Sequence, residues 1–219
     1  MTERVVTVDG PAGSGKTTLG RRLATALDLP LVDTGLFYRG LMVAAVRDGV
    51  GGDEIERLSA LAASSHIEIN TSAAPGWQCR VDGVDAGPIL RDPANAILVS
   101  MVSRIPEVRE HLLAAQRDLA ADGAVAVGRD CGTVVFPDAP VKFYLEAPTA
   151  VRAGRRAEQL GVDAATLAGE VAGRDTLDST RTVAPLRPAA DAHVIDTGTV
   201  GIEQMVADAL EICAKRGIR

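Results

Sequence analysis

The chain has 219 residues, of which 47% are hydrophobic, 24% are charged and only 3% are aromatic. This length and composition suit one α/β domain with a small insertion, in which aliphatic side chains fill a core of parallel strands and helices. The formal net charge of −6 argues against a sequence-independent binder of nucleic acid polymers, and no apolar run is long enough to cross a bilayer, so we expect no membrane partner.

The first part of the chain alternates predicted strands and helices. A β-branched run at 4–9 predicts a buried strand, and the apolar spacing at about 16–27 predicts an amphipathic helix. Residues 29–33 predict a second strand, after which Thr34 and Gly35 begin another helix. This order is typical of βαβ units and therefore of a parallel sheet.

The alternation is interrupted in the middle of the chain. Short strands and turn-rich segments at 66–85, TSAAPG among them, predict a small antiparallel sheet. Two helices are expected at about 92–104 and 106–121, with Pro106 in the first turn of the second. We interpret about 63–105 as a module inserted into the main sheet.

The alternation then resumes to the end of the chain. Strands are predicted at 124–127, 141–145 and 193–196, and helices from near 148, at 163–178 and at 200–216. The core of the domain would therefore comprise about residues 1–62 and 122–219.

The loop between the first strand and the first helix carries the clearest motif. Residues 10–17 read GPAGSGKT and match GxxxxGK[ST] in the strand–loop–helix context that a phosphate-binding loop requires. Its glycines let successive N–H groups face one anion, and the helix N-terminus adds further unpaired N–H groups. Lys16 would bridge the β- and γ-phosphates of ATP, and the Thr17 hydroxyl would bind Mg²⁺. The predicted ATP-binding residues are Gly10, Pro11, Ala12, Gly13, Ser14, Gly15, Lys16, Thr17 and Thr18.

This loop does not identify the molecule that accepts the phosphoryl group. Four further segments of the chain limit the candidates. They read DTGLFYR at 33–39, IPEVR at 105–109, GRDCGTVVFPDA at 128–139 and RDTLDSTRTVAPL at 174–186. In this order and nearly these spacings, the set resembles the bacterial cytidylate kinase family over essentially the whole chain. GRDCGTVVFPDA is the most specific segment, because it separates that family from adenylate, shikimate and dephospho-coenzyme A kinases.

The resemblance implies a fold and a reaction. The fold would be a P-loop three-layer α/β fold, with a parallel sheet flanked by helices, a small inserted antiparallel module that binds the nucleoside monophosphate, and a helical lid at about 148–182. The enzyme would transfer the γ-phosphoryl group of Mg·ATP to CMP or dCMP. Both substrates are anionic, and arginine suits them because it stays charged and offers a planar fork to phosphate oxygens.

The resemblance also implies roles for individual residues. The acceptor phosphate would be bound by Arg39, Arg129 and Arg181, with Tyr38 beside it and Thr34 near that phosphate or the base. The cytosine edge would be read by Ser100, Arg109 and Asp130, and the sugar by Arg174 and Asp178. The lid arginines that close over ATP would be Arg152, Arg155 and Arg156. The groups expected to act on the transferred phosphoryl are Lys16, Arg129, Arg155 and Arg181.

Several alternatives stay open at this point. The three lid arginines are spaced i, i+3, i+4 and could instead form a basic helix face, and Thr34 and Ser100 could be capping residues. Asp33 could cap the following helix. Val127 stands where relatives usually carry an acidic residue, which keeps a catalytically weak nucleotide-binding regulator in view. Another small acceptor, such as UMP, AMP or shikimate, is the alternative within the same chemistry.

The cysteines and the start of the chain bear on location. Cys79, Cys131 and Cys213 have no CxxC spacing, which indicates reduced thiols. The first four residues lead directly into a predicted strand and leave no room for a signal peptide. We therefore expect a cytoplasmic protein, and we expect it to be a monomer.

Overall fold

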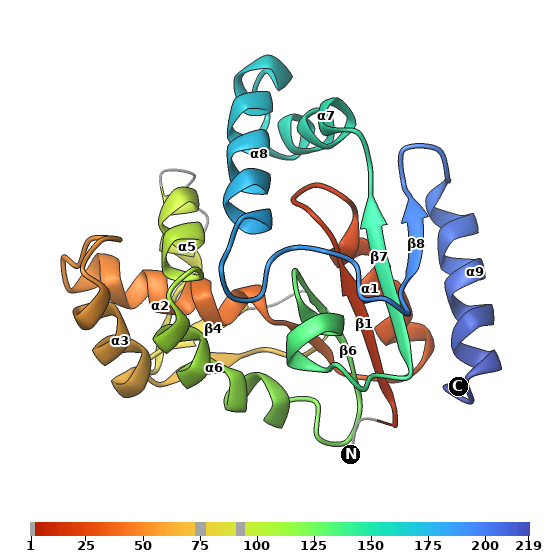
Figure 1. Cartoon of the computed structure of the whole chain (residues 1–219), viewed down its shortest axis with the longest axis horizontal. Helices are drawn as coiled ribbons and strands as arrows, with labels where there is room; N and C mark the ends of the chain where they lie inside the picture. Colours follow the sequence, from red (N-terminus) through yellow and green to blue (C-terminus); the bar gives the residue numbers. More distant parts are fainter. Residues whose placement is uncertain (1–2, 73–77, 91–94) are drawn as a thin grey trace.

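The computed structural model describes residues 3–72, 78–90 and 95–219 of the chain. Its central sheet has five parallel strands in the order β2-β6-β1-β7-β8 (Figure 1). Their bounds, in that order, are Leu31–Asp33, Ala124–Gly128, Val5–Asp9, Val141–Glu146 and His193–Asp196. In the centre, β1 pairs with β6 and β7 so that Asp9 lies opposite Gly128 and Tyr144. The phosphate-binding loop therefore begins at the carboxyl end of the central strand.

Helices cover both faces of this sheet, which confirms the predicted three layers. On one face, α1 (Lys16–Ala26) and α9 (Ile202–Lys215) pack on the β1 side chains Val6 and Val8. On the other face, Val5 packs in a cluster with residues of the segment 131–139 and with the end of α6 (Pro106–Asp118). The β-branched run of β1 is buried on both sides for this reason.

A second hydrophobic cluster lies beside the sheet and contains the small antiparallel sheet that the sequence predicts. That sheet has the order β3-β4-β5, with bounds Ile67–Ile69, Cys79–Val81 and Val84–Asp85. It packs with α2 (Gly35–Arg47), α5 (Ala96–Val102) and α6, and α4 (Gly87–Leu90) adjoins it. Helix α3 (Ile55–Ser64) joins the same cluster and was not anticipated from the sequence.

Parts of two sequence predictions lie outside the described residues. These are most of the TSAAPG turn, which falls within 73–77, and the start of the helix expected from residue 92, which falls within 91–94. The described part of that helix, α5, begins at Ala96.

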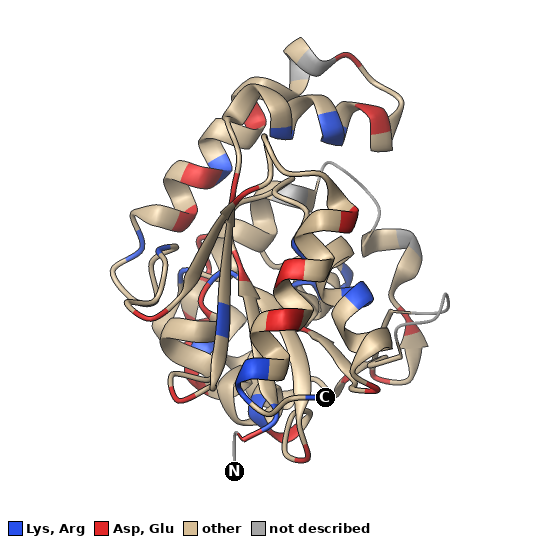
Figure 2. Ribbon diagram, turned by 90° about the vertical axis from the view of Figure 1, so that its right-hand side faces the viewer, with Lys and Arg blue, Asp and Glu red and all other residues tan. Residues whose placement is uncertain are grey.

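Two helices stand over the carboxyl ends of the strands. Helices α7 (Thr149–Leu160) and α8 (Ala164–Ser179) pack against each other above the sheet in Figure 1. A short π-helical turn, η2 (Cys131–Val135), follows β6 directly. In the part of the chain that is described, no helix is both long and apolar enough to cross a membrane. Figure 2 shows acidic and basic residues distributed over many helices and loops.

Candidate active site

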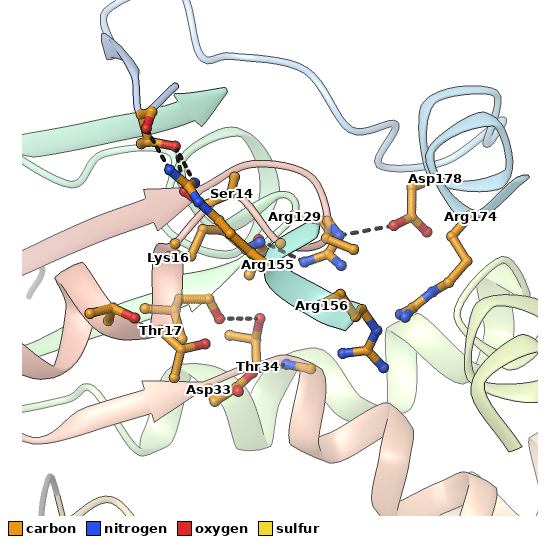
Figure 3. Close-up of a pocket in the computed structure, with 18 of the residues that line it drawn as sticks. Ser14, Lys16, Thr17, Asp33, Thr34, Arg129, Arg155, Arg156, Arg174 and Asp178 are labelled. Atoms are coloured by element: carbon orange, nitrogen blue, oxygen red, sulfur yellow. Dashed lines mark hydrogen bonds and ion pairs between the residues drawn. The ribbon is translucent and has the colours of Figure 1, made fainter. Parts of the chain in front are cut away.

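A cavity of about 530 Å³ opens at the carboxyl ends of β2 and β6, between the phosphate-binding loop, α2, α5, α7 and α8. Figure 3 shows that the labelled side chains reach it from opposite sides, with Lys16 and Thr17 on one side and Arg174 and Asp178 on the other. A ligand site at this edge is expected where parallel strands end, because loops and helix N-termini meet there.

The phosphate-binding loop is tightly fitted to its surroundings. Gly10 has φ +144°, and a Cβ there would lie 2.1 Å from the carbonyl oxygen of Leu145. Gly13 has φ +77°, and its Cβ would lie 2.8 Å from the carbonyl oxygen of Arg152. Only glycine fits these two positions, so the loop has the backbone that the motif predicts.

Lys16 is buried in the first turn of α1, directly after Gly15. Its Nζ donates to the carbonyl oxygen of Pro11 at 2.6 Å. Burial, followed by the charge of Arg129, holds the pKa of Lys16 well below its usual value. An anion in the cavity would supply the negative charge that this ammonium group lacks.

The same side of the cavity offers hard oxygen donors. Thr17 is exposed, and Asp33 lies at the end of β2 with its Oδ1 accepting from the Gly35 N–H at 3.0 Å. The N-cap residue of α2 is Thr34, so Asp33 lies one residue before the position that the capping alternative gave it. Thr17 and Asp33 both line the cavity (Figure 3). No group of three or more His, Cys, Asp or Glu side chains suited to a metal occurs in the described ranges. Mg²⁺ fits such a sparse donor set, because it keeps several waters and binds phosphate oxygens.

On the opposite side, a buried carboxylate joins two predicted acceptor arginines. Asp178 accepts from Arg129 Nε at 2.9 Å through Oδ2 and forms an ion pair with Arg181 through Oδ1. Arg181 Nη2 also donates to Ser103 Oγ at 2.8 Å. Burial alone would raise the pKa of Asp178, but the charges of Arg129 and Arg181 outweigh it and hold the pKa below its usual value. Asp178 is therefore ionised and orients both guanidinium groups.

A second ion pair lies next to this one. Arg109 pairs with Asp130 and donates to the carbonyl oxygen of Ser103 at 3.1 Å. Its guanidinium carbon lies 5.3 Å from the centre of the Tyr38 ring. Burial raises the pKa of Asp130 despite the opposing charge of Arg109. Asp130 and Tyr38 line the cavity, whereas Arg109 lies behind them.

Three further arginines gather at the cavity. Arg39, Arg156 and Arg174 all line it, and Figure 3 shows Arg156 and Arg174 on the same side. Within the described residues, the buried Nε atoms of Arg156 and Arg174 have no hydrogen-bond partner. Burial, together with the charges of Arg129, Arg39 and Arg156, lowers the pKa of Arg174 to about 10. Such mutual repulsion favours a multiply charged anion among them.

The remaining predicted lid arginines differ from each other in placement. Arg155 lines the cavity and donates to Thr197, from Nη1 to Oγ1 at 2.9 Å and from Nη2 to the carbonyl oxygen at 2.6 Å. Arg152 does not line it; the guanidinium is buried and donates to the carbonyl oxygens of Ala12 and Ala147 at 3.1 and 2.9 Å. Arg152 also pairs with Asp175 at 2.6 Å, so its donors are used inside the protein.

The structure thus brings most of the predicted residues to one cavity. Those that line it are Ala12, Gly13, Ser14, Gly15, Lys16, Thr17, Thr18, Thr34, Tyr38, Arg39, Ser100, Arg129, Asp130, Arg155, Arg156, Arg174, Asp178 and Arg181. Those that do not are Gly10, Pro11, Arg109 and Arg152. Thr34 Oγ1 donates to the Val127 carbonyl oxygen at 3.1 Å, so its hydroxyl proton is used within the protein.

Sequence reasoning missed three residues that organise this site. Ser103 accepts from Arg181, Thr197 accepts from Arg155, and Asp9 accepts backbone N–H groups at the turn after β6. Each acts on a partner far away in the sequence, so no local spacing reveals it. The only available signal was a carboxylate at the end of a strand that is otherwise buried and aliphatic.

The chain was compared with known proteins. Residues 6–215 match the family model described as cytidylate kinase. A cytidylate kinase of Rhodococcus jostii is 44% identical over 97% of this chain and 95% of its own length. One from Pelotomaculum thermopropionicum is 41% identical over 92% of each chain, and one from Salmonella arizonae is 42% identical over 97% and 96%.

Solved structures that resemble the chain share its fold at low identity. An uncharacterized protein from Eubacterium ventriosum has a TM-score of 0.56 and 15% identity over 97% of this chain and 99% of its own. A gluconokinase from Sinorhizobium meliloti has a TM-score of 0.50 and 16% identity over 98% and 93%. At these identities the likeness concerns the arrangement of helices and strands.

Proposed function

Since the chain belongs to the cytidylate kinase family, it is a nucleoside monophosphate kinase that phosphorylates CMP or dCMP, and we propose how its residues divide that work. The donor is ATP, bound by the loop at residues 10–18. Three features support this: backbone positions that only glycine fits, a buried ammonium group with no carboxylate partner among the described residues, and the N-terminus of α1 at the cavity wall.

Mg²⁺ would be held by the Thr17 hydroxyl, by phosphate oxygens and by water, with Asp33 on the same side of the cavity. When bound, the ion would neutralise charge on the β- and γ-phosphates. Lys16 would donate to the same phosphates and stabilise the charge that develops during transfer. Val127 supplies no carboxylate near the end of β6, and its register partner on β2 is Asp33, whose carboxylate lines the cavity.

The acceptor phosphate would lie among Arg39, Arg129 and Arg181, which come from three separate segments of the chain. It is already an ionised nucleophile, so the reaction needs no general base. What the protein must supply is alignment with the γ-phosphate and compensation of repulsion between the two anions. The cluster that Arg156 and Arg174 complete offers that compensation.

The acceptor base would be read by Asp130 and Ser100, with Arg109 behind them. Cytosine presents an exocyclic amino group, which a carboxylate can accept, and uracil reverses that donor pattern. A buried polar site left with unpaired groups rejects the wrong base. Arg174 and Asp178 would contact the sugar, and Arg155 and Arg156 would close over ATP from the lid at about 148–182. Arg152 would support the phosphate-binding loop from behind.

The observation that carries this proposal is the convergence of Lys16 and the arginine cluster on one cavity. A coupled assay of ADP release with CMP, dCMP, UMP, AMP and shikimate under saturating Mg·ATP tests it. We expect CMP and dCMP to be preferred. A preference for AMP or shikimate would contradict the base assignment, and binding of ATP and CMP without turnover would favour a regulator.

Two attributes of the whole protein are part of the proposal. All three cysteines are free and buried, which suits a reducing compartment, and we propose the cytoplasm. We also propose a monomer.

A further inference from the structure

Asp9 ends β1 and lies one residue before the phosphate-binding loop, yet it faces the acceptor side of the site. Its side chain is buried, with 4% of the residue exposed. Oδ1 accepts from the Cys131 N–H at 2.8 Å, and Oδ2 accepts from the Gly132 N–H at 2.7 Å. These two amides directly follow Arg129 and Asp130, so both oxygens of one carboxylate hold a single turn.

The turn has little room to move. A Cβ on Gly132 would lie 2.9 Å from Thr7 Oγ1 and 3.4 Å from Asp9 Oδ2. A Cβ on Gly128 would lie 2.4 Å from Thr34 Oγ1. The turn is packed closely against β1 and the start of α2, and the Asp9 carboxylate accepts from the amides of Cys131 and Gly132 within that packing.

Burial makes the ionised form of Asp9 unfavourable at this position. Burial raises its pKa to about 6, and the two backbone N–H groups only partly offset that effect. The ionisable groups that interact with it are Asp130 and the Cys131 thiol from the turn, Lys16 from α1 and Tyr144 from β7. An ionised carboxylate with a raised pKa lowers stability, so stability alone does not account for it.

From this geometry we propose that Asp9 is a positioning residue, which fixes the turn that presents Arg129 and Asp130 to the acceptor nucleotide. The inference rests on the proposed function, because it assumes that the acceptor binds against this turn. Since Asp9 is also joined to the first glycine of the donor loop, it sets the acceptor-binding turn relative to the loop that binds ATP.

The Asp9→Asn variant tests the proposal. The amide keeps the shape of the side chain and one acceptor oxygen, but its NH₂ group faces the second backbone N–H. We expect kcat/KM for CMP to fall by about tenfold to a hundredfold. We expect the thermal midpoint at slightly alkaline pH to change little, because removal of the buried charge offsets the cost of the backbone N–H that loses its acceptor. A lower midpoint with a normal kcat/KM would indicate a purely structural residue and overturn the proposal.

Thr7→Val is the matched control. Thr7 lies two residues earlier on the same face of β1, and its buried Oγ1 has no hydrogen-bond partner among the described residues. We expect its kcat/KM for CMP to stay within about twofold of wild type. If Asp9→Asn behaves in the same way as this control, the proposal is wrong. A wild-type protein that does not phosphorylate CMP would instead contradict the proposed function.

A measurement on the wild-type chain covers the case in which Asp9→Asn does not fold. Amide hydrogen exchange of Cys131 and Gly132, corrected for intrinsic rates, should lose protection below about pH 6, where Asp9 is protonated. The Thr34 amide donates to the Val127 carbonyl oxygen at 3.0 Å and should keep its protection. Equal behaviour of the three amides across this range would contradict the proposal.

Discussion

Arg155 is bound to Thr197 through both terminal nitrogens of its guanidinium group, at 2.9 Å to the hydroxyl and 2.6 Å to the carbonyl oxygen. The same hydroxyl lies 3.1 Å from the carbonyl oxygen of Ser14. Thr197 therefore connects the strand-end loop after β8, helix α7 and the phosphate-binding loop.

This relationship predicts the effect of removing the Thr197 hydroxyl. Thr197→Val should raise KM for ATP by about two- to tenfold, since Arg155 loses one of its two hydrogen bonds. Thr197→Ser, which keeps the hydroxyl, should be close to wild type. Steady-state kinetics with ATP varied at saturating CMP would measure both, and equal KM values for the two variants would contradict the role.

Lys16→Ala should separate catalysis from stability. It removes charge stabilisation from the transferred phosphoryl group, so kcat should fall by about a hundredfold to a thousandfold. The free energy of unfolding should not decrease by a comparable amount, because burial of the ammonium group is unfavourable, as its lowered pKa indicates. Turnover and urea unfolding measure the two effects, and Lys16→Met controls for lost volume. Unchanged turnover would refute the assignment of the loop.

Arg181→Ala should cost on the order of 2–4 kcal/mol of transition-state stabilisation, measured from kcat/KM for CMP. Both the acceptor phosphate and Asp178 lose a partner in this variant. Arg187→Ala is the matched control. Arg187 lies six residues after Arg181 and is exposed, so its substitution should leave kcat/KM for CMP unchanged. A rate near wild type for Arg181→Ala would remove that arginine from the site.

Arg152→Ala should act mainly on stability. The substitution leaves the buried carbonyl oxygen of Ala12 and the Asp175 carboxylate without their partner. Breaking a buried pair costs about 3–5 kcal/mol in the free energy of unfolding, and we expect the lower end of this range because the Asp175 side chain is 23% exposed. Arg152→Lys should restore little of it, because one ammonium group cannot reach acceptors in several directions. A fall in activity at unchanged urea midpoint would favour direct contact with ATP instead.

Asp178 makes the free energy of unfolding depend on pH under acidic conditions. Its pKa in the folded chain lies below the ordinary 3.8, so its contribution to stability is complete above that value. As the pH falls through the folded pKa, the carboxylate is protonated and the contribution is lost. Urea unfolding at several acidic pH values should show this loss in wild type. In Asp178→Asn the curve should be flatter, and an identical slope would contradict the coupling.

The sequence predicted those features that depend on local pattern. The loop at 10–17 was identifiable because strand, glycine spacing and helix are contiguous, and the five strands of the main sheet follow aliphatic runs. The predicted convergence of Arg39, Arg129 and Arg181 rested on family resemblance, and the structure places all three on one cavity.

What could not be predicted depends on partners distant in the sequence. Arg152 is spaced like Arg155 and Arg156 on one helix, but its guanidinium turns to a carbonyl oxygen 140 residues away. Asp9 likewise accepts from amides 122 and 123 residues away. Helix α3 was missed for another reason: its apolar positions serve the second hydrophobic cluster, whose existence no single segment indicates.

That cluster gives the molecule a core outside the central sheet, which unites the small sheet with α2, α3, α5 and α6 and is separate from the two clusters on the faces of the central sheet. Each half of the enzyme thus has its own packing constraints. Substitutions in the cluster that contains Tyr38, which lines the cavity, would alter the acceptor side without changing the packing around the phosphate-binding loop. Evolution could in this way exchange one acceptor for another while inheriting the phosphoryl-transfer machinery intact.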